Sequence, residues 1–315
     1  WRKISRGGDR TMTLHRLLTE GTECLQKAGE PEAALDARTL LLEAFHLDLV
    51  HFLTRRMEPL PETEESARAA ESYRRMVARR SRREPLQHIL GTQMFMGHEF
   101  RVSRHVLIPR QDTEILAEQV LKEQPFPQKR VLDLCTGSGC LAVSLAADGG
   151  YRDVTAADLS EQALDVAREN ARQILGSEQR IRFRQGDLFG ALEPGETFDI
   201  LVSNPPYIPT EVIEGLQPEV RDYEPRMALD GAADGLAFYR RIAAEAADWL
   251  NPGASLYLEI GWDQGKAVRG LLEQAGFAGV EVIQDLAGKD RVVRADLRPD
   301  ARTEKGQGNT GGCDV

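Results

Sequence analysis

An asparagine, two prolines and a tyrosine, Asn204-Pro205-Pro206-Tyr207, follow a strand-like apolar run over residues 198–202. Proline fixes φ and has no backbone N–H, so the carbonyls of Asn204 and Pro205 would lie on a stiff backbone without a competing donor from the prolines. Rigid oxygen acceptors beside an aromatic ring suit a planar group that carries an amide or amine nitrogen. The alternatives are a strand-ending turn at Asn204 and an ordinary core edge at Tyr207.

Three further candidates for ligand binding follow neighbouring strand-like runs. A glycine loop, Thr136-Gly137-Ser138-Gly139, comes first, and Asp158 ends the next run about 20 residues later, near the spacing at which an acidic residue accepts hydrogen bonds from ribose hydroxyls. Asp187 then could accept from an adenine amino group while Leu188 packs on the ring. Each has a simpler explanation when taken alone: the glycine loop as a tight turn, Asp158 as a helix cap, Asp187 as a turn former and Leu188 as a core residue. Together they favour an adenosine-bearing ligand.

Strands and helices alternate around these residues. Strands are predicted over 130–135, 153–158, 181–184, 198–203, 255–260, 280–283 and 291–297, with helices beginning near Cys140 and Ser160 and others near 234–250 and 263–275. This alternation predicts an open, mostly parallel sheet that is covered by helices on both faces. Ligands of such sheets bind beyond the carboxyl ends of the strands, where the candidate residues stand.

Helical periodicity dominates residues 12–90, and prolines divide it into several short helices. The last of these helices carries arginines at 74, 75, 79, 80, 82 and 83, which form either a docking surface or, as we favour, a solvated face. Residues 92–103 read as a hairpin with Gly97-His98 near its turn. Asp112 or Thr113 is then predicted to cap a helix.

The composition is that of an ordinary globular protein, with 41% hydrophobic and 29% charged residues in a chain of 315. No apolar run approaches the roughly 18 residues of a membrane-spanning helix, and no signal peptide is recognisable. We therefore expect a cytoplasmic protein. The net charge of −10 argues mildly against bulk electrostatic binding of nucleic acid. Four cysteines lack paired spacing, so neither a disulfide framework nor a metal site is expected.

The glycine loop, Asp158, Asp187-Leu188 and the Asn-Pro-Pro-Tyr segment follow one another along the chain. In this order they resemble the motifs of S-adenosylmethionine-dependent methyltransferases that methylate planar or amide-type nitrogens. Variants of the Asn-Pro-Pro-Tyr motif occur in adenine-N6 DNA methyltransferases and in protein-glutamine methyltransferases. Over residues 12–297 the chain is similar to the protein-(glutamine-N5) methyltransferases that modify peptide chain release factors. Further segments that carry this resemblance are 85–91, 107–114, 230–236 with Tyr239, 258–261 with Gln264, and 285–291.

The resemblance implies a seven-stranded, Rossmann-like class I methyltransferase sheet of the α/β class, preceded by a small helical bundle and a β-hairpin. We expect a helical substrate-recognition domain over 12–90, a hairpin linker over 91–110 and a methyltransferase domain over 111–297. Residues 1–11 and 298–315 are expected to be disordered. The resemblance also implies S-adenosylmethionine as cofactor and release factors as protein partners, without stable nucleic-acid or membrane binding.

In the implied reaction, the Asn204 side-chain oxygen and the Pro205 carbonyl accept the two hydrogens of the substrate amide. Tyr207 would pack against the amide plane, Leu107 would wall the pocket, and Arg110 would orient the substrate backbone or its own loop. The expected catalytic residues are thus Asn204, Pro205 and Tyr207, with Pro206, Leu107 and Arg110 added for substrate binding. The expected cofactor-binding residues are Asp133, Cys135, Thr136, Gly137, Ser138, Gly139, Asp158, Leu159, Asp187, Leu188 and Asn204.

The chain departs from the family pattern at Gln111, Cys135 and Leu188, where proline, glycine and an aromatic residue are usual. Two other functions stay open at this point. One is a nucleic-acid adenine-N6 methyltransferase, although no basic target-recognition segment is visible. The other is a catalytically idle S-adenosylmethionine-binding module associated with ribosomes, against which the intact Asn-Pro-Pro-Tyr motif counts.

Overall fold

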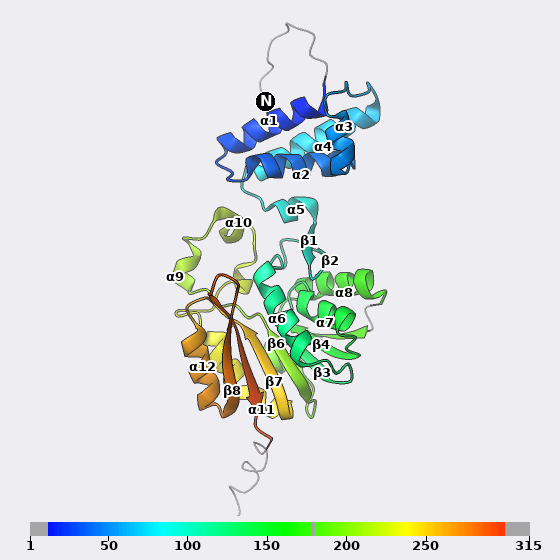
Figure 1. Ribbon diagram of the computed structural model, residues 1–315. Helices are drawn as coiled ribbons and strands as arrows, with labels where there is room; N and C mark the ends of the chain where they lie inside the picture. The colour runs from blue at the N-terminus through cyan, green and yellow to red at the C-terminus, as the bar shows by residue number, and fades with distance from the viewer. Residues whose placement is uncertain (1–11, 178–179, 300–315) are drawn as a thin grey trace, which may run out of the picture. The chain divides into compact units, whose positions relative to one another are not determined.

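A computed structural model describes residues 12–177 and 180–299 of the chain (Figure 1). Disorder was expected for residues 1–11 and 298–315; of these, 1–11 and 300–315 lie outside the described residues. Contacts divide the chain between Leu90 and Gly91 into a helical unit and a sheet unit. Within the described ranges, no helix has the length and apolar character needed to cross a membrane.

The helical unit consists of amphipathic helices around a small apolar core. Its helices are α1 (Leu14–Lys27), α2 (Ala33–Phe45), α3 (Leu49–Arg55), α4 (Glu64–Arg80) and α5 (Leu86–Leu90). Leu17, Leu25 and Leu40 are completely buried, as the helical spacing of the leucines predicts. Threonine side chains cap α1 and α4: Thr13 accepts from the Arg16 N–H, and Thr63 accepts from the Ser66 N–H.

The arginine-rich segment at the end of α4 is only partly a solvated face. Arg80 is 8% exposed and its guanidinium forms ion pairs with Glu30 and with Asp36, the latter at 2.7 Å. Arg83 also pairs with Glu30 at 3.2 Å, and Arg79 forms a two-bond pair with Glu84. Half of the six arginines therefore stabilise the helical unit itself, which periodicity alone does not reveal.

Removing Arg80 should destabilise the helical unit strongly. Arg80→Ala leaves the buried carboxylates of Glu30 and Asp36 without this cation, and we expect the free energy of unfolding to fall by about 3–5 kcal/mol. Urea unfolding followed by circular dichroism measures this. Arg75→Ala is the matched control on the same helix, because the Arg75 side chain is 71% exposed. Equal effects of the two substitutions would contradict the structural role of Arg80.

The sheet unit is built on one mixed sheet, which confirms the predicted seven-stranded class I methyltransferase fold. In the described part of the chain, its seven strands are ordered β5-β4-β3-β6-β7-β9-β8. The bounds are β3 (Arg130–Leu134), β4 (Asp153–Asp158), β5 (Ile181–Gln185), β6 (Phe198–Ser203), β7 (Leu250–Glu259), β8 (Phe277–Gln284) and β9 (Asp290–Leu297). Strands β3 to β7 run parallel, whereas β9 is antiparallel to β7 and β8.

Helices cover both faces of this sheet (Figure 1). On one face, α6 (Gln111–Glu123), α7 (Cys140–Asp148) and α8 (Glu161–Leu175) share an apolar cluster with Val131 and Val202. On the other, α11 (Ala237–Trp249) and α12 (Gly265–Gln274) pack in a second cluster with Leu132 and Leu201. Successive residues of one strand thus face opposite sides of the sheet, which is why most residues of the central strands are apolar.

Short helices occupy the connections near the carboxyl ends of the parallel strands. These are η2 (Leu188–Ala191) after β5, and α9 (Thr210–Ile213), α10 (Pro218–Arg221) and η3 (Arg226–Ala228) between β6 and α11. Ser160 begins α8 as predicted, because its side chain accepts from the Ala163 N–H at 3.2 Å.

The hairpin that follows the helical unit consists of β1 (Thr92–Phe95) and β2 (His98–Arg101). Its turn is Met96-Gly97, both with positive φ, so His98 belongs to the second strand rather than to the predicted turn. Phe95 and Phe100 meet edge to face and are buried with residues of α6 and α7. The hairpin is therefore packed into the sheet unit.

Candidate functional site

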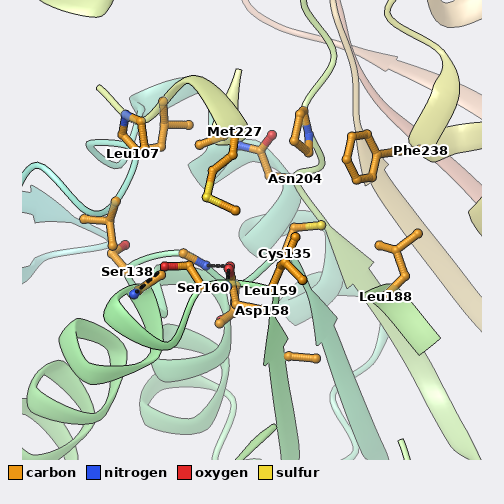
Figure 2. A pocket seen from close by; sticks show the side chains of 18 of the residues that line it. Leu107, Cys135, Ser138, Asp158, Leu159, Ser160, Leu188, Asn204, Met227 and Phe238 are labelled. Atoms are coloured by element: carbon orange, nitrogen blue, oxygen red, sulfur yellow. Dashed lines mark hydrogen bonds between the residues drawn. The ribbon is translucent and has the colours of Figure 1, made fainter. Parts of the chain in front are cut away.

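A cavity of about 550 Å³ lies where β3, β4, β5 and β6 end. Most of the residues predicted for the site from the sequence line it: Leu107, Arg110, Cys135, Thr136, Gly137, Ser138, Asp158, Leu159, Asp187, Leu188, Asn204 and Pro206. Parallel strands bring their carboxyl ends to one edge, which is why residues so far apart in sequence meet here. In the view of Figure 2, Asn204 and Met227 lie on one side of the cavity and Asp158 and Ser160 on the other.

The glycine loop turns sharply between β3 and α7. Gly137 and Gly139 have φ values of 54° and 80°, which favour glycine. At Gly139, an added Cβ would also lie 3.0 Å from the Ala167 Cβ, so the missing side chain lets α7 approach α8. Cys135 adopts φ 59° although it is not glycine, at the position where glycine is usual.

Asp133 does not line the cavity, and its carboxylate forms hydrogen bonds that stabilise the glycine loop. Its Oδ2 atom accepts from the Thr136 hydroxyl at 2.6 Å and from the Ala142 N–H at 3.2 Å. The side chain is fully buried, and burial raises the pKa of Asp133 to about 7 against these two hydrogen bonds. Asp133 and Gly139 are not among the lining residues, and both shape the loop that is.

Asp158 connects two backbone segments at the cavity. One carboxylate oxygen accepts from the Gly137 N–H and the other from the Ser160 N–H, both at 2.9 Å. Burial raises the pKa of Asp158, and these N–H groups oppose the shift. Because each carboxylate oxygen has two lone pairs, both oxygens retain one acceptor site for a ligand.

A further wall combines apolar and charged side chains. Leu188 is 4% exposed and lines the cavity together with Phe238 (Figure 2). The Asp187 carboxylate pairs with Arg241 at 2.9 Å and remains 55% exposed. Phe238 and Arg241 were not predicted from the sequence, because they belong to the first turns of α11, whose pattern indicates only an amphipathic helix. Met227, also missed, lies in η3.

The Asn204 side chain is held by residues of other elements. Its Nδ2 donates to Thr113 Oγ1 at 3.2 Å, across from α6. Glu259, the last residue of β7, is 2% exposed, and burial raises its pKa to about 7 against the effects of Thr113, Arg291 and Asn204. The amide hydrogens of Asn204 thus face the protein, which leaves Oδ1 as the acceptor for a ligand.

The predicted capping of α6 by Asp112 or Thr113 is wrong. The helix begins after Arg110 without a side-chain cap. Thr113 is instead buried against Asn204, and Asp112 forms an ion pair with Arg291 at 3.0 Å. Both side chains thus contact residues that are distant in sequence and do not cap the backbone N–H groups of α6.

Tyr207 and Pro205 do not line the cavity. The Tyr207 side chain packs on the apolar cluster beside α11, and its backbone carbonyl accepts from Gln264 Nε2 at 3.0 Å. Gln264 donates as well to the Gly235 carbonyl at 3.3 Å. Gln264 therefore holds the Asn-Pro-Pro-Tyr segment in place from the start of α12.

Gly235 should tolerate no side chain beside this segment. Its φ is 73°, and an added Cβ would lie 2.3 Å from the Tyr207 carbonyl oxygen. Gly288 has a similar φ of 76° with nothing within 4 Å, so it reports the backbone strain alone. We expect Gly288→Ala to lower the free energy of unfolding by about 1–2 kcal/mol, and Gly235→Ala to lower it further. Urea unfolding of both variants checks this, and equal losses would contradict the steric role.

Leu107 and Arg110 lie in the loop before α6. Leu107 lines the cavity near Asn204 (Figure 2). The Arg110 guanidinium pairs with the buried Glu224 carboxylate at 2.6 Å, and Glu224 also accepts from the Ile108 N–H at 3.4 Å. Burial raises the pKa of Glu224, while Arg110 opposes the shift. Of the two roles predicted for Arg110, these contacts favour orientation of its own loop.

Comparison with known proteins assigns the chain to a family. A release factor glutamine methyltransferase of Geobacter sulfurreducens is 43% identical over 281 residues, which covers 89% of this chain and 95% of that protein. The chain belongs to the release factor glutamine methyltransferase family. A member from Cereibacter sphaeroides is 45% identical over 273 residues, or 87% of this chain and 94% of that protein.

Family models match the two parts of the chain separately. Residues 16–91 match the PrmC N-terminal domain, and residues 110–214 match the methyltransferase small domain. A solved protein-(glutamine-N5) methyltransferase (release factor-specific) from Alicyclobacillus acidocaldarius is 32% identical, with a TM-score of 0.38; the match covers 64% of this chain and all of that one.

Proposed function

We propose that this methyltransferase moves a methyl group from S-adenosylmethionine to the side-chain amide nitrogen of the glutamine in the Gly-Gly-Gln loop of peptide chain release factors. One observation supports the proposed methylation of an amide nitrogen. The Asn204 side chain lines the cavity and its Nδ2 atom donates a hydrogen bond to Thr113 Oγ1, which leaves Oδ1 to accept from a ligand. Family membership carries the substrate class. Such a substrate would be met in the cytoplasm, where ribosomes terminate translation.

The cavity fits the cofactor. Its volume of about 550 Å³ falls within the range of small-molecule sites. Asp158 offers one free lone pair on each oxygen for the two ribose hydroxyls, and Leu188 and Phe238 offer an apolar wall for adenine. Asp187 stands beside this wall as an acceptor for the adenine amino group. When bound, S-adenosylmethionine supplies an electrophilic methyl group on a sulfonium.

A glutamine amide is a weak nucleophile, because its nitrogen lone pair is delocalised into the carbonyl. The protein therefore has to position and polarise it. Asn204 Oδ1 would accept one amide hydrogen and the Pro205 carbonyl the other, which directs the nitrogen towards the methyl group. As positive charge develops on the nitrogen, the same oxygens bind its hydrogens more strongly, so the transition state gains more than the ground state. The nitrogen forms its bond to the methyl carbon as the methyl–sulfur bond breaks, which leaves a neutral thioether, and it then releases one of its two hydrogens as a proton to water.

Pro205 is not among the lining residues, but it lies between Asn204 and Pro206, which are, and we propose its carbonyl as the second acceptor. No hydrogen bond from residues 12–177 or 180–299 reaches it, and Pro206 cannot supply a competing N–H. Tyr207 contributes in our proposal by anchoring the motif, through its carbonyl bonded to Gln264 and its ring packed on the cluster beside α11.

Labelled S-adenosylmethionine distinguishes the protein substrate from nucleic acid. We expect label to enter a purified release factor and not duplex DNA that contains adenine, when each is offered at equal concentration. Label in the DNA, bound with steep salt dependence, would instead indicate an adenine methyltransferase. Calorimetric binding of the cofactor without label in either acceptor would indicate an idle binding module and would contradict the proposal.

A further inference from the structure

Three buried or half-buried polar side chains from separate elements lie at one wall of the cavity, which Asn204 and Thr113 line and Glu259 does not. Asn204 follows β6, and Glu259 ends β7 beside it, since Ser203 and Leu258 are paired in the parallel register. Thr113 comes from α6, and its hydroxyl oxygen lies 3.2 Å from Asn204 Nδ2. Thr113 is 1% exposed and Glu259 is 2% exposed, so water does not compete freely for either group.

The chemistry of these groups sets the direction of their hydrogen bonds. Above the raised pKa of Glu259, about 7, its ionised carboxylate only accepts, whereas a hydroxyl both donates and accepts, and a carboxamide can present either its oxygen or its nitrogen. If Thr113 donates its proton to Glu259, its oxygen can only accept from Asn204. Asn204 must then turn its NH₂ group inwards and its Oδ1 atom outwards.

Thr113 and Asn204 both act to lower the pKa of the Glu259 carboxyl against the effect of burial. Other charged groups around this carboxyl are Asp112 on α6 and Arg291 on β9. Glu259 Oε2 itself has no partner within hydrogen-bonding distance among the described residues. A buried carboxylate with spare acceptor capacity thus lies next to Asn204 in the register of β6 and β7.

We infer that Glu259 and Thr113 are positioning residues that fix the orientation of the Asn204 carboxamide, with its oxygen towards the substrate. The inference rests on the proposed function, because it explains how Asn204 is kept as an acceptor. Without Glu259 as a fixed acceptor, the Asn204 carboxamide could flip by 180° at little energetic cost. It would then present its NH₂ group to the substrate amide. An NH₂ group would repel the amide hydrogens that Oδ1 is needed to accept.

The decisive pair of variants differs by one hydroxyl group. Thr113→Val keeps the shape of the side chain and removes the hydroxyl, and we expect kcat for methylation of a release factor to fall by about 10- to 100-fold. Thr113→Ser keeps the hydroxyl and should retain kcat close to that of the wild type. The calorimetric Kd for S-adenosylmethionine should be nearly the same in all three proteins, because neither substitution touches Asp158 or the glycine loop.

Glu259→Gln gives a second, nearly isosteric test. A glutamine can present NH₂ to Thr113, so the direction of the hydrogen bonds is no longer determined, and kcat should fall while cofactor Kd stays constant. If Thr113→Val fails to bind cofactor, Glu259→Gln becomes the deciding test of the positioning role. An unchanged kcat in Glu259→Gln, or equal losses in Thr113→Val and Thr113→Ser, would overturn the inference. An inactive wild type that still binds cofactor would instead overturn the proposed function.

Discussion

Asn204→Ala should abolish most turnover while the protein still binds its cofactor. The substitution removes the acceptor that lines the cavity, and loss of one group that stabilises a transition state costs about 100- to 1,000-fold in kcat. S-adenosylmethionine affinity should change little, because Asp158 and the glycine loop are intact. Initial rates with a release factor, together with calorimetric titration of the cofactor, measure the two quantities separately.

Thr210→Ala is the matched control for Asn204→Ala. Thr210 lines the same cavity, but its hydroxyl donates to Asp230 at 2.7 Å instead of facing the motif. We expect its kcat to remain near that of the wild type. If Asn204→Ala kept its activity, or lost activity and cofactor binding in equal proportion, the role assigned to Asn204 would be incorrect.

Asp158→Ala should have the largest effect on cofactor affinity. Two hydrogen bonds from ribose hydroxyls to a charged acceptor would be lost, each worth about 1.5–3 kcal/mol, so Kd should rise by about 100-fold or more. The Gly137 and Ser160 N–H groups would also lose their acceptor, which loosens the loop. Isothermal titration with S-adenosylmethionine measures the change.

Asp165→Ala provides the comparison for Asp158→Ala, because Asp165 is a 69% exposed carboxylate on α8 away from the cavity. Its cofactor Kd should equal that of the wild type. At saturating cofactor, kcat of Asp158→Ala should largely recover, since Asn204 is unchanged. A Kd unaffected by Asp158→Ala would contradict the ribose-binding role.

The architecture of the sheet unit could be predicted because its signals are local. Residues 131–134 and 198–203 are mostly apolar, as strands buried on both faces require, and glycines mark the turn after β3. Residues that end such strands gather at one edge whatever the details of packing. Asp158, Leu188 and Asn204 therefore reached the cavity as predicted.

Side-chain partners that are distant in sequence could not be predicted in this way. Thr113 and Asp112 precede a helix and so resemble caps, yet they contact Asn204 and Arg291. Glu259 ends an apolar strand, where nothing in the local pattern separates a buried carboxylate from an exposed one. Arg80 belongs to an arginine run that suggests a solvated face, but its partners Glu30 and Asp36 lie on other segments.

Location of the transferred methyl group tests the central claim most directly. The protein is incubated with a purified release factor and isotopically labelled S-adenosylmethionine, and the product is digested and analysed by tandem mass spectrometry. The proposed function predicts one added methyl group on the side-chain nitrogen of the glutamine in the Gly-Gly-Gln loop, absent with Asn204→Ala. A methyl group on any other residue, or none on a release factor that is fully folded, would contradict it.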